Sequence, residues 1–221
     1  MSSRVIKDWA DDASDTFIGR FGERLKTRGS SFKERLNATV YRLKAQQEKL
    51  EGATARIRSQ DQKLFRKCVE AQVTKDRARA FMYANECAEL RKIMKTTLSC
   101  HLALEQVTLR LETVRQFGDI AALMSPVASV VSSVKTQLSG VMPEVSYELG
   151  EIYESLDTLA VEFGETAGVS ERSELASEEA TSIIREASAV AEQQLKEKFP
   201  DLPSPQLQAE KKTLESLNSD A

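Results

Sequence analysis

The chain contains few of the residues on which strand-rich folds depend. Aromatic residues make up 6% of its 221 residues, and there are nine glycines and five prolines. This scarcity excludes a sandwich or a barrel, which needs aromatic and β-branched strands joined by frequent turns. Charged residues reach 29%, a proportion that suits long amphipathic helices. We therefore predict an all-α fold with an extended architecture.

The sequence also lacks a catalytic constellation. Its single histidine is His101, no serine or cysteine stands in a nucleophile-like context, and there is no glycine-rich phosphate loop. Cys87 and Cys100 lie about 20 Å apart on one predicted helix, which is too far for both to share a metal ion with His101. We therefore expect a protein that is not an enzyme and that binds no cofactor and no metal.

Long apolar runs are missing as well. The longest nearly apolar run, Ile120 to Val131, is about a dozen residues, whereas a bilayer span needs roughly 20. The first 25 residues contain four aspartates and no uninterrupted apolar core, unlike a leader peptide. The three cysteines, Cys68, Cys87 and Cys100, are an odd number, which indicates free thiols in a reducing compartment. These features predict a cytoplasmic protein.

Charge is divided unevenly between the two halves of the chain. Residues 1–118 carry 24 Lys and Arg against 15 Asp and Glu, whereas residues 119–221 carry 7 against 19. The halves therefore have net charges of +9 and −12. Such polarity lets the acidic half fold back on the basic half, or lets the basic half meet an anionic surface once it is released.

From Ser30 onward an apolar residue recurs every seven positions, as in a coiled coil. The row consists of Leu36, Leu43, Leu50, Ile57, Leu64, Ala71 and Ala78. A base precedes each of the first five members, and Arg28 lies seven residues before the first of these bases. Together the six bases form a cationic ridge that consists of Arg28, Arg35, Arg42, Lys49, Arg56 and Lys63. On a helix the ridge is about 50 Å long.

The cationic ridge has two interpretations. It is either a solvated flank that sets helix pairing or a surface for anionic lipid. Residues 20–67 hold 14 bases and 5 acids, and each base near an anionic membrane contributes about 1 kcal/mol. Nucleic acid ranks below lipid, because Tyr41 is nearly the sole aromatic residue there for base stacking. We expect the ridge to bind anionic lipid.

A second long helix supplies the partner for the first. After a short connection between Ala71 and Asp76, apolar residues step by three and four from Leu90 to Val114. Two long helices joined by so few residues must form an antiparallel hairpin. A further apolar row consists of Met94, Leu98, Leu102 and Leu109. It needs a cover, either from later helices or from neighbouring subunits, and we interpret it as a polymerisation surface.

The ends of the chain carry their own signals. Residues 1–29 form an N-terminal arm whose Trp9, Phe17 and Phe21 either enter the membrane interface or pack on the body. Shorter helices are predicted from Ile120 to about Val141 and after Pro143. Residues 166–198 form a linker and an acidic helix, from about Ser173, which we expect to restrain the hairpin.

The last segment, residues 199–221, is a proline-containing tail. Its FPDLPSP stretch either stops the preceding helix or presents apolar anchors on a stiff extended strand. We favour the second interpretation, since a stiff peptide loses little entropy on binding. The anchors are Phe199, Pro200, Leu202 and Pro203.

The stretch from Arg79 to Asp157, with the run YANECAELRK at Tyr83 to Lys92, resembles the ESCRT-III core and in particular the archaeal cell-division B (CdvB) paralogues. The likeness covers residues 30–165, the helical core, in the order of its elements. It implies a subunit that polymerises with itself and with sister paralogues on membranes in cell division or vesicle budding. The basic first helix would face lipid, and the acidic C-terminal helix would restrain the free monomer.

The resemblance also implies an ATPase partner. Family members end in a motif that binds the MIT domain of a Vps-type AAA ATPase (CdvC in archaea), and Phe199 to Pro203 is similar to its proline-rich version. The expected location is the cytoplasmic side of the membrane at the division site. The rival interpretation is a passive coiled-coil adaptor or tether whose seams are permanent contacts.

Overall fold

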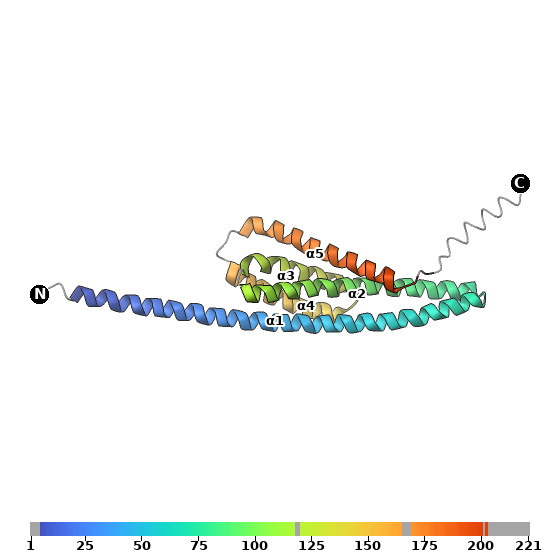
Figure 1. Ribbon diagram of the computed structural model, residues 1–221, viewed down its shortest axis with the longest axis horizontal. Helices are drawn as coiled ribbons and strands as arrows, with labels where there is room; N and C mark the ends of the chain where they lie inside the picture. Colours follow the sequence, from blue (N-terminus) through green and yellow to red (C-terminus); the bar gives the residue numbers. More distant parts are fainter. Residues whose placement is uncertain (1–4, 118–119, 165–168, 201, 203–221) are drawn as a thin grey trace.

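Five helices make up the part of the chain that the computed structural model describes. It describes the backbone of residues 5–117, 120–164, 169–200 and 202, and side chains from residue 31 onward within those ranges, except near the breaks. The helices are α1 (Val5–Val73), α2 (Arg77–Phe117), α3 (Ile120–Leu138), α4 (Pro143–Gly164) and α5 (Val169–Lys198). No strand occurs over the described residues. The predicted all-α fold with a long helical hairpin is confirmed (Figure 1).

The turn between α1 and α2 explains why the hairpin is so tight. Asp76 N donates to Ala71 O at 2.8 Å and Lys75 N donates to Gln72 O at 3.0 Å, the two hydrogen bonds of a Schellman cap. Lys75 takes the left-handed conformation, with φ of 60°, that this cap requires. Asp76 then accepts from Arg79 N at 3.1 Å and so caps the first turn of α2.

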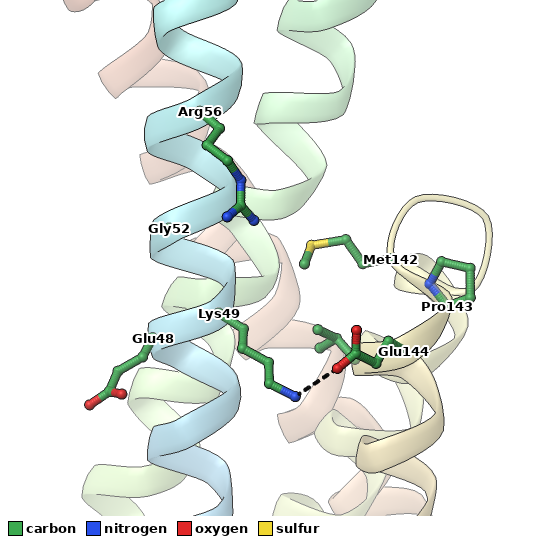
Figure 2. A pocket seen from close by; sticks show the side chains of 8 residues that line it. Glu48, Lys49, Gly52, Arg56, Met142, Pro143 and Glu144 are labelled. Carbon is green, nitrogen blue, oxygen red and sulfur yellow. Dashed lines mark hydrogen bonds and ion pairs between the residues drawn. The ribbon is translucent and has the colours of Figure 1, made fainter.

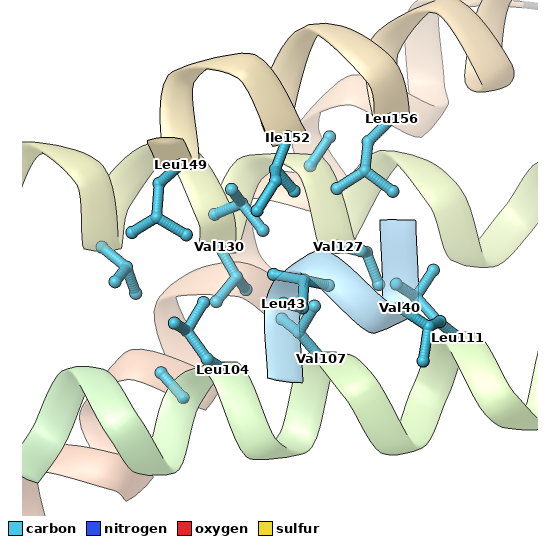
Figure 3. Close-up of a cluster of buried hydrophobic side chains, with 14 of the residues drawn as sticks. Val40, Leu43, Leu104, Val107, Leu111, Val127, Val130, Leu149, Ile152 and Leu156 are labelled. Atoms are coloured by element: carbon cyan, nitrogen blue, oxygen red, sulfur yellow. The ribbon is translucent and has the colours of Figure 1, made fainter. Parts of the chain in front are cut away.

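The hydrophobic core lies where all five helices meet, away from the hairpin turn. Figure 3 shows Leu43 of α1, Val107 of α2, Val130 of α3 and Ile152 of α4 converging on one another, and each is fully buried. Ala180, Ile183 and Ala187 of α5 join the same cluster. Burial of these side chains is worth roughly 1.5–3 kcal/mol for each large one, so the core holds α3, α4 and α5 against the hairpin.

The later helices cover different sides of the hairpin. α4 packs against α3 and α1, whereas α5 packs against α2 and α3 (Figure 1). Beyond them the hairpin continues alone to its turn, where small residues fill the narrow seam between α1 and α2. These are Cys68, Ala71, Ala80, Ala84 and Cys87. Within the described residues, none of the helices is apolar over a stretch long enough to cross a bilayer.

Two element boundaries differ from the sequence-based expectation. α1 begins at Val5 and runs unbroken through Ser30, so residues 5–29 continue the long helix instead of forming a separate arm. The three glycines in this stretch, Gly19, Gly22 and Gly29, do not end the helix, because one glycine costs a helix only about 1 kcal/mol. α5 begins at Val169, inside the segment expected as linker.

The heptad row lies off the buried face at Ile57 and Leu64, between the fully buried Leu50 and the buried Ala71 near the turn. Leu36, Leu43 and Leu50 are fully buried, whereas Ile57 and Leu64 are half-buried. Asp61 and Cys68 take the buried positions instead. A seven-residue repeat falls about 20° short of two full turns on a straight helix, which moves the row off the contact face unless the pair supercoils fully.

Candidate functional site

The cationic ridge on α1 lies against the acidic face of α4. Three of its bases form ion pairs with glutamates that come from α4 in reverse order along the chain, so the two helices are antiparallel. The pairs are Arg35 with Glu162 at 2.6 Å, Arg42 with Glu148 at 3.5 Å and Lys49 with Glu144 at 3.2 Å. All six side chains keep at least 38% of their surface exposed. The ridge is thus neutralised by contacts that water still reaches.

The next bases of the ridge lie beyond the reach of α4. Arg56 borders a hollow of about 420 Å³ between α1 and the turn before α4, together with Lys49 and Met142 (Figure 2). Arg56 and Lys63 are both exposed and form no ion pair with any described residue. The side chain of Arg28 lies outside the described residues. The ridge therefore has a covered part and an open part.

Helix α5 is attached to α2 by polar contacts along its length. Lys95 donates to Glu192 at 2.7 Å, and Ser99 and Ser188 share a hydrogen bond of 2.9 Å. Arg110 pairs with Glu179 further along. Hydrogen bonds from Lys95 and Lys196 lower the pKa of Glu192 from 4.5 to about 2. The helix that we expected to restrain the hairpin packs on α2 and α3, whereas α4 is the helix that meets the cationic ridge. Its restraining role stays a prediction.

The end of α5 reaches a cluster that sequence analysis did not find. Arg91 of α2 forms a two-armed ion pair with Asp61 of α1, at 2.9 and 3.3 Å. Its third nitrogen, Nη1, donates to the carbonyl of Pro200 at 2.7 Å. The guanidinium also lies over the rings of Phe65 and Phe199, 5.8 and 5.2 Å from their centroids. One arginine thus links both arms of the hairpin to the start of the tail.

One signal in the sequence points to this cluster. Asp61 stands four residues after Ile57 and three before Leu64, so it falls on the apolar face of α1. A carboxylate in that position needs a cationic partner from the facing helix. The partner, Arg91, belongs to the YANECAELRK run.

The structure places the remaining predicted residues as follows. Phe199 and Leu202 are half-buried and Pro200 is exposed, while Pro203 lies outside the described residues. The backbone of Trp9, Phe17 and Phe21 is helical, and their side chains also lie outside the described part of the chain. Membrane contact by the arm and ATPase contact by the tail stay predictions.

The second apolar row of α2 is largely covered within the chain. Met94 is 2% exposed, and Leu102 packs against the core. Leu98 is half-buried, and Leu109 alone of the four is fully on the surface, at 57% exposed. Met94 is buried in the seam between α1 and α2, whereas its neighbour Ile93 is 37% exposed. The structure thus leaves Leu109 alone fully accessible, and the use of the row for polymerisation stays a prediction.

The three cysteines are free and buried. Burial raises the pKa of the Cys100 thiol to about 12. Burial, and then the nearby charge of Asp61, raises the pKa of Cys87 to about 11. Thiols with such pKa values are protonated and inert at neutral pH. Over the described residues, no three His, Cys, Asp or Glu side chains gather as metal ligands would.

Comparison with known proteins finds relatives in Sulfolobus acidocaldarius. The chain is 51% identical to Cell division protein B1 over 172 residues, which is 78% of this chain and 80% of the relative. It is 34% identical to Cell division protein B over 178 residues, covering 80% and 68%. It is 31% identical to Cell division protein B3 over 117 residues, covering 53% and 68%.

The other two comparisons add no relative, since no protein-family model and no solved structure matches the chain. The alignments with the B1 and B proteins cover about four-fifths of this chain. The chain therefore belongs to the cell division protein B family, the CdvB-type archaeal paralogues of ESCRT-III.

Proposed function

We propose that the chain is a subunit which polymerises into filaments on membranes during archaeal cell division or vesicle budding, and constricts or severs them. Membership of the cell division protein B family supports the role in division. The subunit acts from the cytoplasmic side as a peripheral membrane protein at the division site. Its energy comes from a Vps-type AAA ATPase whose MIT domain binds Phe199 to Pro203.

The main observation behind this proposal is that α4 covers part of the cationic ridge through exposed ion pairs. The three ion pairs between α1 and α4 are solvent-exposed, and such pairs contribute about 0.2–1 kcal/mol each. Each base that meets an anionic bilayer gains about 1 kcal/mol. The electrostatic contributions to the two states are therefore close, and the apolar packing of α4 in the core is the main contribution that a membrane has to overcome.

The open part of the ridge gives the membrane a first point of contact. Arg56 and Lys63 are exposed and available while α4 is still in place. Long-range attraction of these bases to anionic headgroups would bring the chain to the surface before the ion pairs exchange. Ionic strength should weaken this step, because exposed charges are screened within about 10 Å at 0.1 M salt.

The partners in the filament are further copies of the chain and its sister paralogues. Three B-type proteins of one organism are related to this chain, which supports mixed assembly. When α3 and α5 leave α2, Leu102 would join the already exposed Leu109 on a surface that a neighbouring subunit can reach. Buried apolar surface of this kind is what a growing filament can use.

Charge reversal in the open part of the ridge tests lipid binding. The double variant Arg56→Glu and Lys63→Glu should bind anionic vesicles at least thirtyfold more weakly, because about 2 kcal/mol is lost with two bases. Cosedimentation with vesicles that contain phosphatidylglycerol measures the loss. No described ion pair involves either residue, so the closed bundle should keep its thermal stability.

A charge-matched control separates position from net charge. Arg58 and Arg66 are exposed on other faces of α1, and reversing both changes the net charge by the same amount. We expect this control to bind vesicles nearly as well as the unaltered chain. Equal losses in the two variants would refute a ridge-specific lipid surface. A chain whose stoichiometry in light scattering stays constant with anionic vesicles would be a passive tether instead.

A further inference from the structure

Arg91 is the most highly connected polar side chain where the tail begins. Its Nε and Nη2 donate to the two carboxylate oxygens of Asp61, at 2.9 and 3.3 Å, and its Nη1 donates to the Pro200 carbonyl at 2.7 Å. The planar guanidinium therefore binds Asp61 with two of its nitrogens and the Pro200 carbonyl with the third. A lysine could not reproduce this geometry, since its ammonium is a point charge without a fork.

Aromatic rings complete the surroundings of the guanidinium. Its central carbon lies 5.2 Å from the centroid of the Phe199 ring and 5.8 Å from that of Phe65. Both distances are within the range of about 6 Å in which a cation is attracted to a ring face. Phe65 belongs to the hairpin and Phe199 to the tail, so the arginine attracts one ring from each.

The hairpin half of this cluster does not depend on the tail. The Asp61 side chain is 2% exposed and that of Arg91 16% exposed, so α1 and α2 hold the pair in a fixed orientation. A carboxylate this deeply buried keeps its cationic partner in place. The remaining nitrogen of Arg91 and the face of its guanidinium then point to the site that Phe199 and Pro200 fill.

We propose that Asp61, Phe65 and Arg91 form a receptor site on the hairpin for the Phe199–Pro200 dipeptide of the same chain. Because Phe199 and Pro200 open the segment proposed to dock the ATPase, the site and the MIT domain compete for one peptide. This consequence rests on the proposed function. The docking segment therefore becomes available to the MIT domain when the end of α5 leaves the hairpin.

The position of α5 supports an occupant from the same chain. Lys95 anchors Glu192 at 2.7 Å, less than two helical turns before the end of α5 at Lys198. Phe199 N still donates to Leu195 O at 3.0 Å, so the helix delivers the dipeptide directly to Arg91. The peptide reaches the receptor site with little additional loss of chain entropy, as expected for a tethered ligand.

Hydrogen exchange on the full chain tests the receptor site. Arg91→Lys keeps a positive charge for Asp61 but loses the fork and the ring contacts. We expect exchange of the Phe199 amide, which donates to Leu195 O, to become roughly tenfold faster, as loss of one charge-assisted hydrogen bond predicts. Phe65→Leu is the second variant, because it removes one ring and leaves the Asp61–Arg91 pair intact. It should accelerate exchange in the same segment.

Lys92 is the matched control. It is the neighbouring base on α2, and it pairs with Glu89 on its own helix. Lys92→Ala should leave exchange at the Phe199 amide unchanged. Unaltered exchange in both Arg91→Lys and Phe65→Leu would overturn the receptor site. Protection that disappears on dilution of the unaltered chain would also overturn it, because the occupant would then come from a second copy.

Binding of the purified MIT domain of the ATPase gives the second readout. If the dipeptide is sequestered, Arg91→Lys should bind the domain more tightly than the unaltered chain, by about the same tenfold factor. Tighter binding without faster exchange would overturn the receptor site. Faster exchange with no MIT binding to either chain would overturn the proposed ATPase docking and would support the receptor site.

Discussion

At the scale of single residues, Lys75 carries a conformational cost at the turn of the hairpin. Among the described residues it is the one non-glycine residue with a positive φ, at 60°. The left-handed conformation costs an L-residue roughly 1 kcal/mol because Cβ approaches the following carbonyl oxygen. The Schellman cap between α1 and α2 nevertheless imposes it, since the hydrogen bonds of the turn depend on that residue.

Lys75→Gly should therefore stabilise the hairpin. We expect the free energy of unfolding to rise by up to about 1 kcal/mol, offset in part by the greater freedom of glycine in the unfolded chain. Urea denaturation followed by circular dichroism measures the change. Lys63→Gly, in the middle of the exposed face of α1, is the contrasting variant and should destabilise by about 1 kcal/mol. A loss of stability in Lys75→Gly would contradict the cap.

Gln46 is a second residue that carries a free-energy cost in the folded chain. It is 4% exposed, and its Oε1 has no hydrogen-bond partner within the described structure. An unsatisfied buried acceptor of this kind costs about 1–3 kcal/mol. The cost disappears in any form of the chain in which water reaches the amide. Gln46 thus narrows the free-energy gap between the closed bundle and a more open form.

At the scale of elements, α5 is held by a charge contact as well as by its apolar face. Ala180, Ile183, Ala187 and Ala191 are buried on one side, while Glu192 receives hydrogen bonds from Lys95 and Lys196. Alanine contributes little apolar area, so the polar contacts carry a larger share of the attachment than in the leucine-rich hairpin.

The pH dependence of stability follows from Glu192. Its pKa is about 2 in the folded chain and about 4.3 when unfolded. A lowered folded-state pKa stabilises the protein above the unfolded value, and this contribution is lost as the pH falls through the window between the two. The contribution of Glu192 to stability should thus be the same at neutral and at mildly acidic pH. As the pH falls from about 4.3 toward 2, the attachment of α5 should weaken progressively.

Glu192→Gln checks this assignment. The variant should be less stable than the unaltered chain at pH 7, and the difference should shrink as the pH approaches 2. Urea denaturation at several pH values measures both profiles. Glu197→Gln is the control, because Glu197 is exposed at the end of α5 and pairs with Gln193 on its own helix. Parallel profiles for Glu192→Gln and the unaltered chain would count against the Lys95 contact.

At the scale of the whole molecule, two acidic helices pack on the hairpin from different sides. α4 forms ion pairs with three bases of the ridge of α1, and α5 covers α2 and α3 and places Phe199 on Arg91. The cationic ridge and the surface of α2 are therefore covered by different elements. In the proposed assembly, loss of α5 would uncover part of α2 and loss of α4 would expose the ridge.

Removal of α5 should release self-assembly. A chain that ends after Thr166 loses the cover of α2 and α3, so we expect it to form large species in sedimentation velocity and ordered filaments in electron microscopy. A chain that ends after Leu202 keeps α5 and the Arg91 contact and should remain monomeric. A monomer after the longer deletion, or amorphous particles alone, would contradict the restraining role of α5.

Much of this architecture followed from the sequence because it depends on local periodicity. Leu36, Leu43 and Leu50 repeat every seven residues and are buried as that repeat predicts. The short segment between Ala71 and Asp76 left antiparallel pairing as the only arrangement. The bases beside the apolar row lie next to it on the helix surface for the same reason. Hairpin, ridge and helix order are consequences of spacing along one chain.

Other features depended on tertiary structure, since they join residues that are distant in the sequence. Both α4 and α5 carry glutamates on a helical face, and charge alone does not determine which of them meets the ridge. Packing of Ile152 and Leu156 in the core set that choice by orienting α4 along α1. The site around Arg91 combines Asp61, Phe65 and Phe199, and only the folded register of three helices brings these side chains within contact distance.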